Sequence, residues 1–371
     1  MPEPPRVLFA IGGLGRGGSE RQLVQLIAAT HPHRLRATVL TLSTVCDPDH
    51  AAQLRELGVE LIQLAPARIP RAARPAVSVP RVFAAVRRTR PDAIYAWLEE
   101  ASATVFPAAW ALRAPLVIAR RSVCGSGVEK LAVYRIPIHL AERQARIVTG
   151  NSEPVLAEAE ARGVPPTRLR LVRNGHPRVE PLPEPDGAEV ALGYVANYRA
   201  EKGHERLLEA LSLLQAKTAW RLDMVGTGQM HAQVKRAIAR RGLSQRVTAG
   251  TQITDIDAFW RTHHFAVLLS DDEGSPNALI EAAMRGRPAV GTDGGGTPEV
   301  VGEDGGLLVP HDPREIADAL RRLIDDRELR VALGCGAHRR ALEMYDLDKF
   351  VDGHLAAIVE ATGCRVRGRS S

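Results

Sequence analysis

The feature that most constrains the fold is a regular alternation of short apolar runs with segments of helical period. In the first half, runs such as RVLFAI (6–11), AIYAWL (93–98) and RIVTGN (146–151) each precede a stretch with apolar residues at helical spacing. The same alternation resumes with ALGYVAN (191–197) and FAVLLS (265–270). Strands that alternate with helices in this way are typical of βαβ units. The sequence therefore predicts an α/β fold built on parallel sheets.

The division into two domains follows from length and from one unusual segment. A chain of 371 residues exceeds what a single hydrophobic core usually organises. The segment VEPLPEPDG (179–187) is rich in proline and acidic residues, separates the two series of strands, and is interpreted as a linker. We expect an N-terminal domain over residues 1–180 and a C-terminal domain over 181–371, with the final helix packing back on the first. In open parallel sheets ligands bind beyond the carboxyl ends of the strands, where we look for functional residues.

Targeting and cysteine patterns point to a cytoplasmic protein. No apolar run approaches the roughly 18–20 residues of a membrane span, and MPEPPRVLFAIGG enters a strand without the regions of a signal peptide. The four cysteines, Cys46, Cys124, Cys335 and Cys364, have no C-x-x-C spacing. This pattern favours free thiols over a zinc site or a redox pair.

Charge is unevenly distributed along the chain. The net charge is +6, but residues 1–185 hold 25 Lys/Arg against 16 Asp/Glu (+9), whereas residues 186–371 hold 24 against 27 (−3). Such asymmetry favours an anionic partner for the first half, and nucleic acid, a phospholipid surface or a pyrophosphate-bearing lipid all fit. A solvated basic face fits equally well.

The basic residues concentrate in one stretch. Residues 65–90 contain seven arginines and no acidic residue, and Arg81–Arg90 is predicted to form an amphipathic helix with Val82, Phe83 and Val86 on one face. Such a helix docks on anionic membranes, or it is an ordinary surface helix packed by its apolar face. The sequence leaves both readings open.

The most informative chemistry lies near residue 275. A predicted strand ends at Ser270, a loop carries Glu273, Pro276 stands where a helix begins, and Glu281 follows on that helix. Carboxylates bind the hydroxyl pairs of sugars and riboses, and a helix N-terminus suits a diphosphate. Two glutamates eight positions apart carry little information alone.

The complete string SDDEGSPNALIEAAMRGRPAVGTDGGGTPEV (270–300) resembles the E-x7-E signature of family 4 glycosyltransferases with the GT-B fold. GGLGRGGSERQLVQLIA (12–28) resembles that family's N-terminal glycine loop, and residues 147–175 the stretch before its interdomain connection. GYVANYRAEKGHERLLEAL (193–211) resembles the segment that supplies phosphate-binding cations. The resemblance implies two Rossmann-like parallel-sheet domains facing a central cleft, and retaining transfer from a nucleotide-diphosphate sugar.

Site residues are carried over position by position. The resemblance implies that Glu273 contacts the hydroxyls of the donor sugar, that Glu281 contacts the nucleotide ribose, and that Lys202 neutralises the diphosphate. It also implies that sugar and phosphate are held by backbone amides near Gly274, Ser275, Ala278 and Leu279.

Two departures from the family pattern concern arginines. The family arginine usually precedes the lysine by five residues, where this chain has Asn197; Arg199 would reach the same phosphates. Many relatives also end the strand before the cleft in a histidine, whereas this chain has Arg120 and Arg121. An arginine cannot act as a base near neutral pH. We expect one of them to stabilise the leaving phosphate or to bind an anionic acceptor, with a surface salt bridge as the alternative.

Two further expectations concern the glycine loop and metals. Gly17 and Gly18 would let the backbone approach the donor phosphates or the acceptor closely. The motif GLGRGG (13–18) lacks an acidic residue at the end of the next strand, which disfavours a dinucleotide site. Because the resemblance assigns the counter-charge to Arg199 and Lys202, we expect no metal and no cofactor.

The sequence therefore predicts a retaining glycosyltransferase that acts on a glycan or lipid-linked acceptor in cell-surface polysaccharide synthesis. An anionic membrane surface is a further expected partner and nucleic acid is not. One alternative is a UDP-sugar epimerase of the same fold, although Glu273, Glu281 and Lys202 together fit transferases better. The other is a non-catalytic protein that binds membranes or polyanions.

Overall fold

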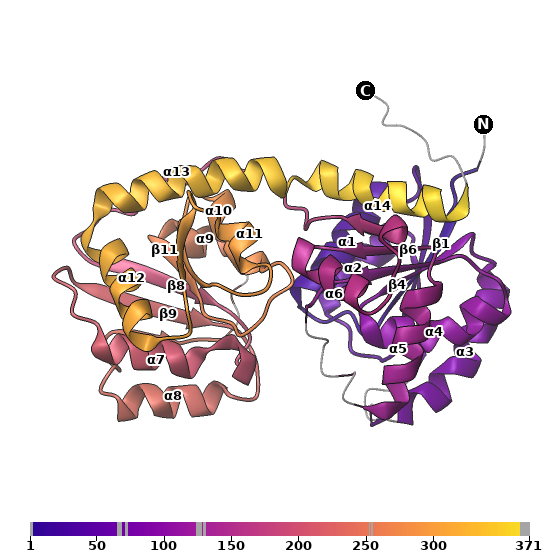
Figure 1. The fold of residues 1–371 in the computed structure, drawn as a ribbon, viewed down its shortest axis with the longest axis horizontal. Helices are drawn as coiled ribbons and strands as arrows, with labels where there is room; N and C mark the ends of the chain where they lie inside the picture. The colour runs from indigo at the N-terminus through magenta and orange to yellow at the C-terminus, as the bar shows by residue number, and fades with distance from the viewer. Residues whose placement is uncertain are drawn as a thin grey trace. The chain divides into compact units, whose positions relative to one another are not determined.

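The computed structural model describes residues 3–64, 69–70, 73–123, 128, 131–251, 253 and 255–363. The chain divides into two compact units, Met1–Gly175 with Asp348–Ser371, and His176–Leu347. Each unit has its own parallel sheet with helices on both faces (Figure 1). The α/β fold with two Rossmann-like sheets is therefore confirmed.

The first unit is built on a parallel sheet of seven strands within its described residues, in the order β3-β2-β1-β4-β5-β6-β7. The order reverses between β1 and β4, which pair through Val7–Ala93 to Ile11–Trp97. The strands are β1 (Arg6–Ile11), β2 (Arg36–Thr41), β3 (Glu60–Gln63), β4 (Ala93–Trp97), β5 (Leu116–Arg120), β6 (Ile147–Gly150) and β7 (Leu169–Leu171).

Helices cover both faces of this sheet because its central strands are apolar on both sides. Ile94 and Ala96 face α3, α4 and α5, whereas Tyr95 and Trp97 contact α14, which Figure 1 shows in yellow on this unit. The helices are α1 (Gly18–Thr30), α2 (Pro48–Glu56), α3 (Arg74–Thr89), α4 (Glu99–Ala111), α5 (Ala132–Gln144), α6 (Glu153–Ala161), the 3₁₀ helix η3 (Pro166–Arg168) and α14 (Leu347–Thr362).

The second unit repeats the same topology with six strands among its described residues, in the order β10-β9-β8-β11-β12-β13. The order reverses between β8 and β11, the position at which doubly wound sheets bind ligands. The strands are β8 (Val190–Val195), β9 (Trp220–Val225), β10 (Val247–Ala249), β11 (Phe265–Leu268), β12 (Ala289–Thr292) and β13 (Gly306–Val309).

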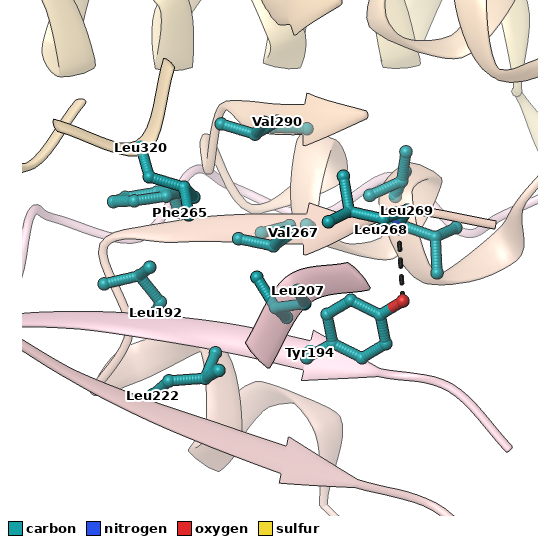
Figure 2. Packing of buried hydrophobic residues seen from close by; sticks show 14 of the residues in the cluster. Leu192, Tyr194, Leu207, Leu222, Phe265, Val267, Leu268, Leu269, Val290 and Leu320 are labelled. Atoms are coloured by element: carbon teal, nitrogen blue, oxygen red, sulfur yellow. Dashed lines mark hydrogen bonds between the residues drawn. The ribbon is translucent and has the colours of Figure 1, made fainter. Parts of the chain in front are cut away.

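The core of the second unit fixes the strands that carry the site. Figure 2 shows Leu192 and Phe265 of the central strands packed with Leu207 and Leu320, and all four side chains are fully buried. The helices are the 3₁₀ helix η4 (Ala200–Lys202), α7 (His204–Leu213), α8 (His231–Arg240), α9 (Ile256–Arg261), α10 (Asn277–Met284), α11 (Thr297–Val301), α12 (Pro313–Asp325) and α13 (Arg327–Met344).

The predicted linker, 179–187, packs on the second unit. The side chain of Arg287 donates to the carbonyls of Leu182 and Pro183 at 3.2 and 2.7 Å, and Arg330 donates to Glu184 at 3.0 Å. The boundary between the units falls at Gly175 and His176.

The helix predicted from the arginine-rich stretch is α3, and its apolar face is not available to a membrane. Val82 and Val86 are 0% and 4% exposed and pack against the sheet, and Phe83 packs beside them. Insertion of this face is therefore excluded, whereas Arg87 and Arg88 lie on the exposed side of the helix. Residues 65–68 and 71–72 of the stretch lie outside the described residues.

Cys46 and Cys335 are free thiols, and Cys124 and Cys364 lie outside the described residues. Within the part of the chain that the structure describes, no helix is long and apolar enough to cross a membrane.

Candidate functional site

The candidate site lies at the reversal of strand order in the second unit. Lys202 ends η4 in the loop after β8, and Glu273 lies in the loop after β11, so neighbouring parallel strands bring the two loops together. The ammonium Nζ of Lys202 donates to Oε1 of Glu273 at 2.6 Å, and their side chains are 20% and 17% exposed. A cation and a carboxylate predicted from separate motifs are thus direct partners.

Backbone contacts hold the two loops in register. The Tyr194 hydroxyl donates to the carbonyl of Lys202 and accepts from the Leu269 N–H at 3.3 Å, a contact drawn in Figure 2. Gly203 has φ +67°, and a Cβ there would overlap the carbonyl of Leu269. Only glycine fits such a position without strain. The loop of Lys202 is therefore fixed against the end of β11.

Hydrogen bonds also orient Glu273. The Ser270 hydroxyl donates to Oε1 of Glu273 at 2.7 Å, and the Thr292 hydroxyl donates to the Ser270 carbonyl at 2.6 Å. The Gly296 N–H donates to the Glu273 carbonyl at 2.7 Å. The carboxylate is held on one oxygen by an ammonium and a hydroxyl, which pre-organises it for a polar ligand.

Sequence reasoning missed the residue that follows this lysine turn. His204 is 3% exposed and lies between Tyr194 and Tyr198, with ring centroids 5.1 and 4.9 Å away. Burial lowers the pKa of His204 to about 4, so the imidazole is neutral at pH 7. The Tyr198 hydroxyl donates to the carbonyls of Met224 and Gly250 at 3.1 and 2.8 Å. A single histidine directly after Gly203 contributes no hydrophobic periodicity, so the sequence does not predict that His204 packs between the two tyrosines.

The predicted arginine partner lies in the same loop but points to solvent. The side chain of Arg199 is 63% exposed, and its guanidinium lies 3.8 Å from the carboxylate of Glu201. Asn197, which occupies the usual arginine position, is exposed and accepts a hydrogen bond from the Thr227 hydroxyl at 3.3 Å. Arg199 is thus a long, exposed cation about one turn from Lys202, whereas the lysine side chain is mostly buried.

The remaining donor residues cluster at the start of α10. Gly274 and Ser275 are buried in the loop before this helix, Ala278 is partly exposed in its first turn, and Glu281 is 6% exposed one turn further. The Leu279 N–H already donates to the Pro276 carbonyl at 3.1 Å. Its amide is therefore engaged at the start of the helix, and the role of these amides in holding sugar and phosphate stays a prediction.

Gly17 and Gly18 begin α1 in the first unit. Gly17 is the N-cap, and a Cβ at this position would overlap the carboxylate of Glu20 in the first turn. A carboxylate there already interacts with the positive end of the helix and opposes an incoming phosphate. This geometry favours a contact with a neutral group over the predicted phosphate contact.

Arg120 has a structural role in place of the predicted catalytic one. It is 1% exposed at the end of β5, where its guanidinium pairs with Glu142 of α5 and, at 2.7 Å, with Glu158 of α6. Both ends of the guanidinium fork are thus committed to carboxylates within the unit. The structure thus shows the alternative, a salt bridge, but Arg120 and Glu142 are buried and do not lie on the surface.

Arg121 is also enclosed, with 7% of its surface exposed. Its guanidinium stacks over the Trp97 ring at 4.8 Å and donates to Oδ1 of Asn174 at 2.6 Å. Burial lowers the pKa of Arg121 to about 10, which leaves it charged at neutral pH. These contacts are those of a residue that positions its neighbours.

Comparisons with known proteins agree with this geometry. A family model described as "Glycosyl transferase 4-like domain" matches residues 17–175, and one described as "Glycosyl transferases group 1" matches residues 189–326. The two matches together span most of the chain, and their boundary falls close to that between the structural units. The chain belongs to the family 4-like glycosyltransferases of the GT-B fold.

Individual relatives support the same family. The MMP alpha-(1->4)-mannosyltransferase of Mycolicibacterium hassiacum is 32% identical over 44% of this chain and 41% of its own length. The N-acetyl-alpha-D-glucosaminyl L-malate synthase of Bacillus anthracis is 26% identical over 44% of each chain. The chain thus spans less than half the length of these curated relatives. HepE of Anabaena, solved in complex with UDP-glucose, shares the fold with a TM-score of 0.81 at 21% identity over 95% of this chain and 98% of that one.

Proposed function

We propose that this protein is a retaining glycosyltransferase that moves a sugar from a nucleotide-diphosphate sugar to a hydroxyl of a glycan or lipid-linked acceptor. The observation that carries the proposal is the contact between Lys202 and Glu273 at the switch point of the second sheet, where Nζ and Oε1 lie 2.6 Å apart. A ligand that satisfies both groups presents an anion and a hydroxyl side by side. A sugar linked to a diphosphate has this arrangement.

The proposed roles follow from the position of each group. Lys202, with Arg199 as its exposed companion, neutralises the diphosphate, because an ammonium or guanidinium forms strong charge-assisted hydrogen bonds with phosphate oxygens. Glu273 accepts hydrogen bonds from the hydroxyls of the donor sugar. Glu281, one turn inside α10, accepts from the ribose hydroxyls, and the loop amides near Gly274 complete the seat.

The transfer itself requires no base from the protein. The acceptor oxygen forms a bond to the anomeric carbon on the face from which the diphosphate departs, and the bond between that carbon and the phosphate oxygen breaks. The acceptor proton passes to the departing diphosphate oxygen, so the products are the glycoside and the free nucleotide diphosphate. Arg199 and Lys202 supply the counter-charge that a metal would otherwise provide, and we propose a metal-independent reaction.

The transferred group is proposed to be a hexose or an N-acetylhexosamine. The named relatives support this range, since one is named a mannosyltransferase and the other an N-acetyl-alpha-D-glucosaminyl L-malate synthase. A glycan or lipid-linked acceptor favours a role in the synthesis of a cell-surface polysaccharide.

We also propose that the first unit contacts an anionic membrane surface on its cytoplasmic side. Helices α3, α4 and α5 lie next to one another in this unit (Figure 1). Arg87 and Arg88 are exposed on α3, and Trp110 and Ile136 are 68% and 64% exposed on α4 and α5. Exposed cations and exposed apolar side chains on neighbouring helices are the combination that interfacial binding uses.

A two-step experiment tests the enzymatic proposal. Thermal shift against UDP-, GDP- and ADP-sugars identifies the donor, since ligand binding raises apparent stability. The selected sugar is then incubated with cell-envelope acceptors, and the anomeric configuration of the product is read by NMR. Retention of configuration supports the proposal. Inversion, or conversion of the donor into its epimer with no transfer, would overturn it in favour of another mechanism or of an epimerase.

A further inference from the structure

A row of buried or half-buried polar side chains lies at the carboxyl edge of the first sheet. Four neighbouring strands, β4 to β7, each contribute to it, and the row begins where the strand order reverses between β1 and β4. The residues are Glu99 after β4, Arg121 and Ser122 after β5, Asn151 and Ser152 after β6, and Asn174 after β7.

Several atoms of this row have no hydrogen-bond partner among the described residues. They are Oε2 of Glu99, Nε of Arg121, Oδ1 of Asn151 and Oγ of Ser152, in residues that are 2%, 7%, 3% and 1% exposed. An unsatisfied buried polar atom costs on the order of 1–3 kcal/mol, and more for a charged group, so such atoms usually bind a ligand or a water. Four of them along one sheet edge, where open parallel sheets bind ligands, indicate a binding site.

Glu99 is the focus of this row. Its Oε1 accepts from the Ser122 hydroxyl at 3.0 Å, and no described cation pairs with its carboxylate. The adjacent Glu100, by contrast, pairs with Arg74 at 3.0 Å. Leu98, which precedes Glu99, has φ +74° and ψ 163°, a conformation that a residue with a side chain adopts only under strain. The turn that presents Glu99 is thus strained.

The charges of the row define the ligand class. Arg120 is neutralised by Glu142 and Glu158, whereas Arg121, which belongs to the row, donates to the neutral amide of Asn174 and stacks over the Trp97 ring. The row therefore holds one guanidinium and one carboxylate and carries no net charge, which favours a neutral ligand over an anionic one. A neutral sugar supplies the hydroxyl donors that the unsatisfied oxygens lack.

We infer that Glu99 and Ser122 bind a hydroxyl pair of a neutral sugar unit of the acceptor, with Asn151 and Ser152 completing the site. This inference rests on the proposed function, and it restricts the acceptor: the unit bound by this row carries no phosphate or uronate. It also replaces the expectation that Arg120 or Arg121 binds an anionic acceptor.

The test compares neutral and anionic probes on the full chain. Saturation-transfer NMR measures binding of methyl α-glucoside, methyl α-mannoside and methyl α-galactoside against glucuronic acid and glucose 1-phosphate. At least one neutral methyl glycoside should bind. Glu99→Gln keeps the shape of the side chain and should weaken glycoside binding about tenfold or more, because the sugar hydroxyls no longer donate to a charged carboxylate. Ser122→Ala should weaken it about threefold because the carboxylate of Glu99 loses the hydroxyl that orients it. Glu60→Gln, the same change at an exposed position of this unit, should leave binding unchanged.

The outcomes separate this inference from the proposed function. Binding of an anionic probe that Glu99→Gln weakens, no binding of any neutral glycoside at tens of millimolar, or unchanged neutral-glycoside binding in Glu99→Gln would overturn the inference. Nucleotide-diphosphate binding, measured in parallel by calorimetry, should be the same in wild type and Glu99→Gln. If wild type binds no nucleotide diphosphate, the proposed function fails whatever the glycosides do. If it binds and Glu99→Gln transfers sugar with unchanged acceptor KM, only the inference fails.

Discussion

Replacing Lys202 by methionine isolates the contribution of the cation that the structure places at the switch point. Methionine keeps the length of the side chain and removes its charge, so the packing of η4 and the hydrogen bond from Tyr194 to the Lys202 carbonyl should persist. A hydrogen bond to a charged group contributes roughly 1.5–3 kcal/mol. Because the Lys202 side chain is 20% exposed and partly screened, we expect a loss of about 2 kcal/mol, or about 30-fold in Kd for a nucleotide diphosphate.

The partner carboxylate provides an internal check. In Lys202→Met the carboxylate of Glu273 keeps the Ser270 hydroxyl at 2.7 Å but loses its cation, so it repels the diphosphate. The double variant Lys202→Met/Glu273→Gln removes that repulsion. It should bind the nucleotide diphosphate about fivefold more tightly than the single variant, a coupling of roughly 1 kcal/mol typical of residues in contact.

Calorimetry with a nucleotide diphosphate and with the nucleoside alone measures both effects. The nucleoside carries no phosphate, so its affinity should be the same in wild type and Lys202→Met. Lys235→Met, at an exposed position on α8 of the same unit, is the matched control and should bind like wild type. Diphosphate affinity within twofold of wild type in Lys202→Met, or an equal loss for the nucleoside, would refute the assignment of Lys202.

Four further predictions follow from the same geometry. Glu273→Ala should chiefly lower kcat, whereas Glu281→Ala should weaken nucleotide-diphosphate binding; near-wild-type kinetics in both would show that the donor residues are misassigned. Transfer should survive EDTA, and loss of activity that magnesium or manganese restores would contradict the role given to the cations. Burial lowers the pKa of His204 from 6.5 to about 4, so the unfolded chain binds the extra proton and stability falls as pH drops from 6.5 to 4, by about 3 kcal/mol at the lower end. Urea unfolding should show this slope in wild type and a shallower one in His204→Gln, and equal slopes would contradict it. Neutralising Arg87 and Arg88 should reduce flotation with anionic liposomes at low salt, by about fivefold per residue, and leave nucleotide affinity unchanged; wild type that fails to float even at low salt would remove the membrane from the proposal.

The fold was largely predictable because it depends on periodicity, which is local. Each apolar run that was predicted to be a strand contains one in the structure, for example β11 within FAVLLS. The strand β7, Leu169–Leu171, was missed because three half-buried residues give no period. The sequence did not decide whether the apolar face of α3 contacts the core or a membrane, because an amphipathic pattern is the same in both cases. In the structure this face packs against the core.

The site was predictable only where a motif spans it. Glu273 and Lys202 were each found from their own segments, but their contact is a property of the sheet order, which places the loops after β8 and β11 together. The buried ion pairs of Arg120 were not predictable, because Glu142 and Glu158 come from separate helices that the fold brings to β5. The side-chain packing around His204 has the same non-local origin.

The net charge of the first half of the sequence does not match the charged groups at the carboxyl edge of the first sheet. Residues 1–185 carry a net charge of +9, which favours an anionic partner. At the carboxyl edge of the first sheet, however, Arg120 and Arg121 are enclosed, Arg120 is paired with two carboxylates, and Arg121 lies in the same row as the unsatisfied carboxylate of Glu99. The equivalent edge of the second sheet carries the partly exposed ammonium of Lys202, although residues 186–371 have a net charge of −3. Because buried groups interact over a few ångströms while surface charges are screened beyond roughly 8–10 Å, the local groups decide what each edge binds. We therefore propose an anionic donor on the second unit and a neutral sugar on the first, with the exposed Arg87 and Arg88 of α3 as the contact for a separate anionic surface.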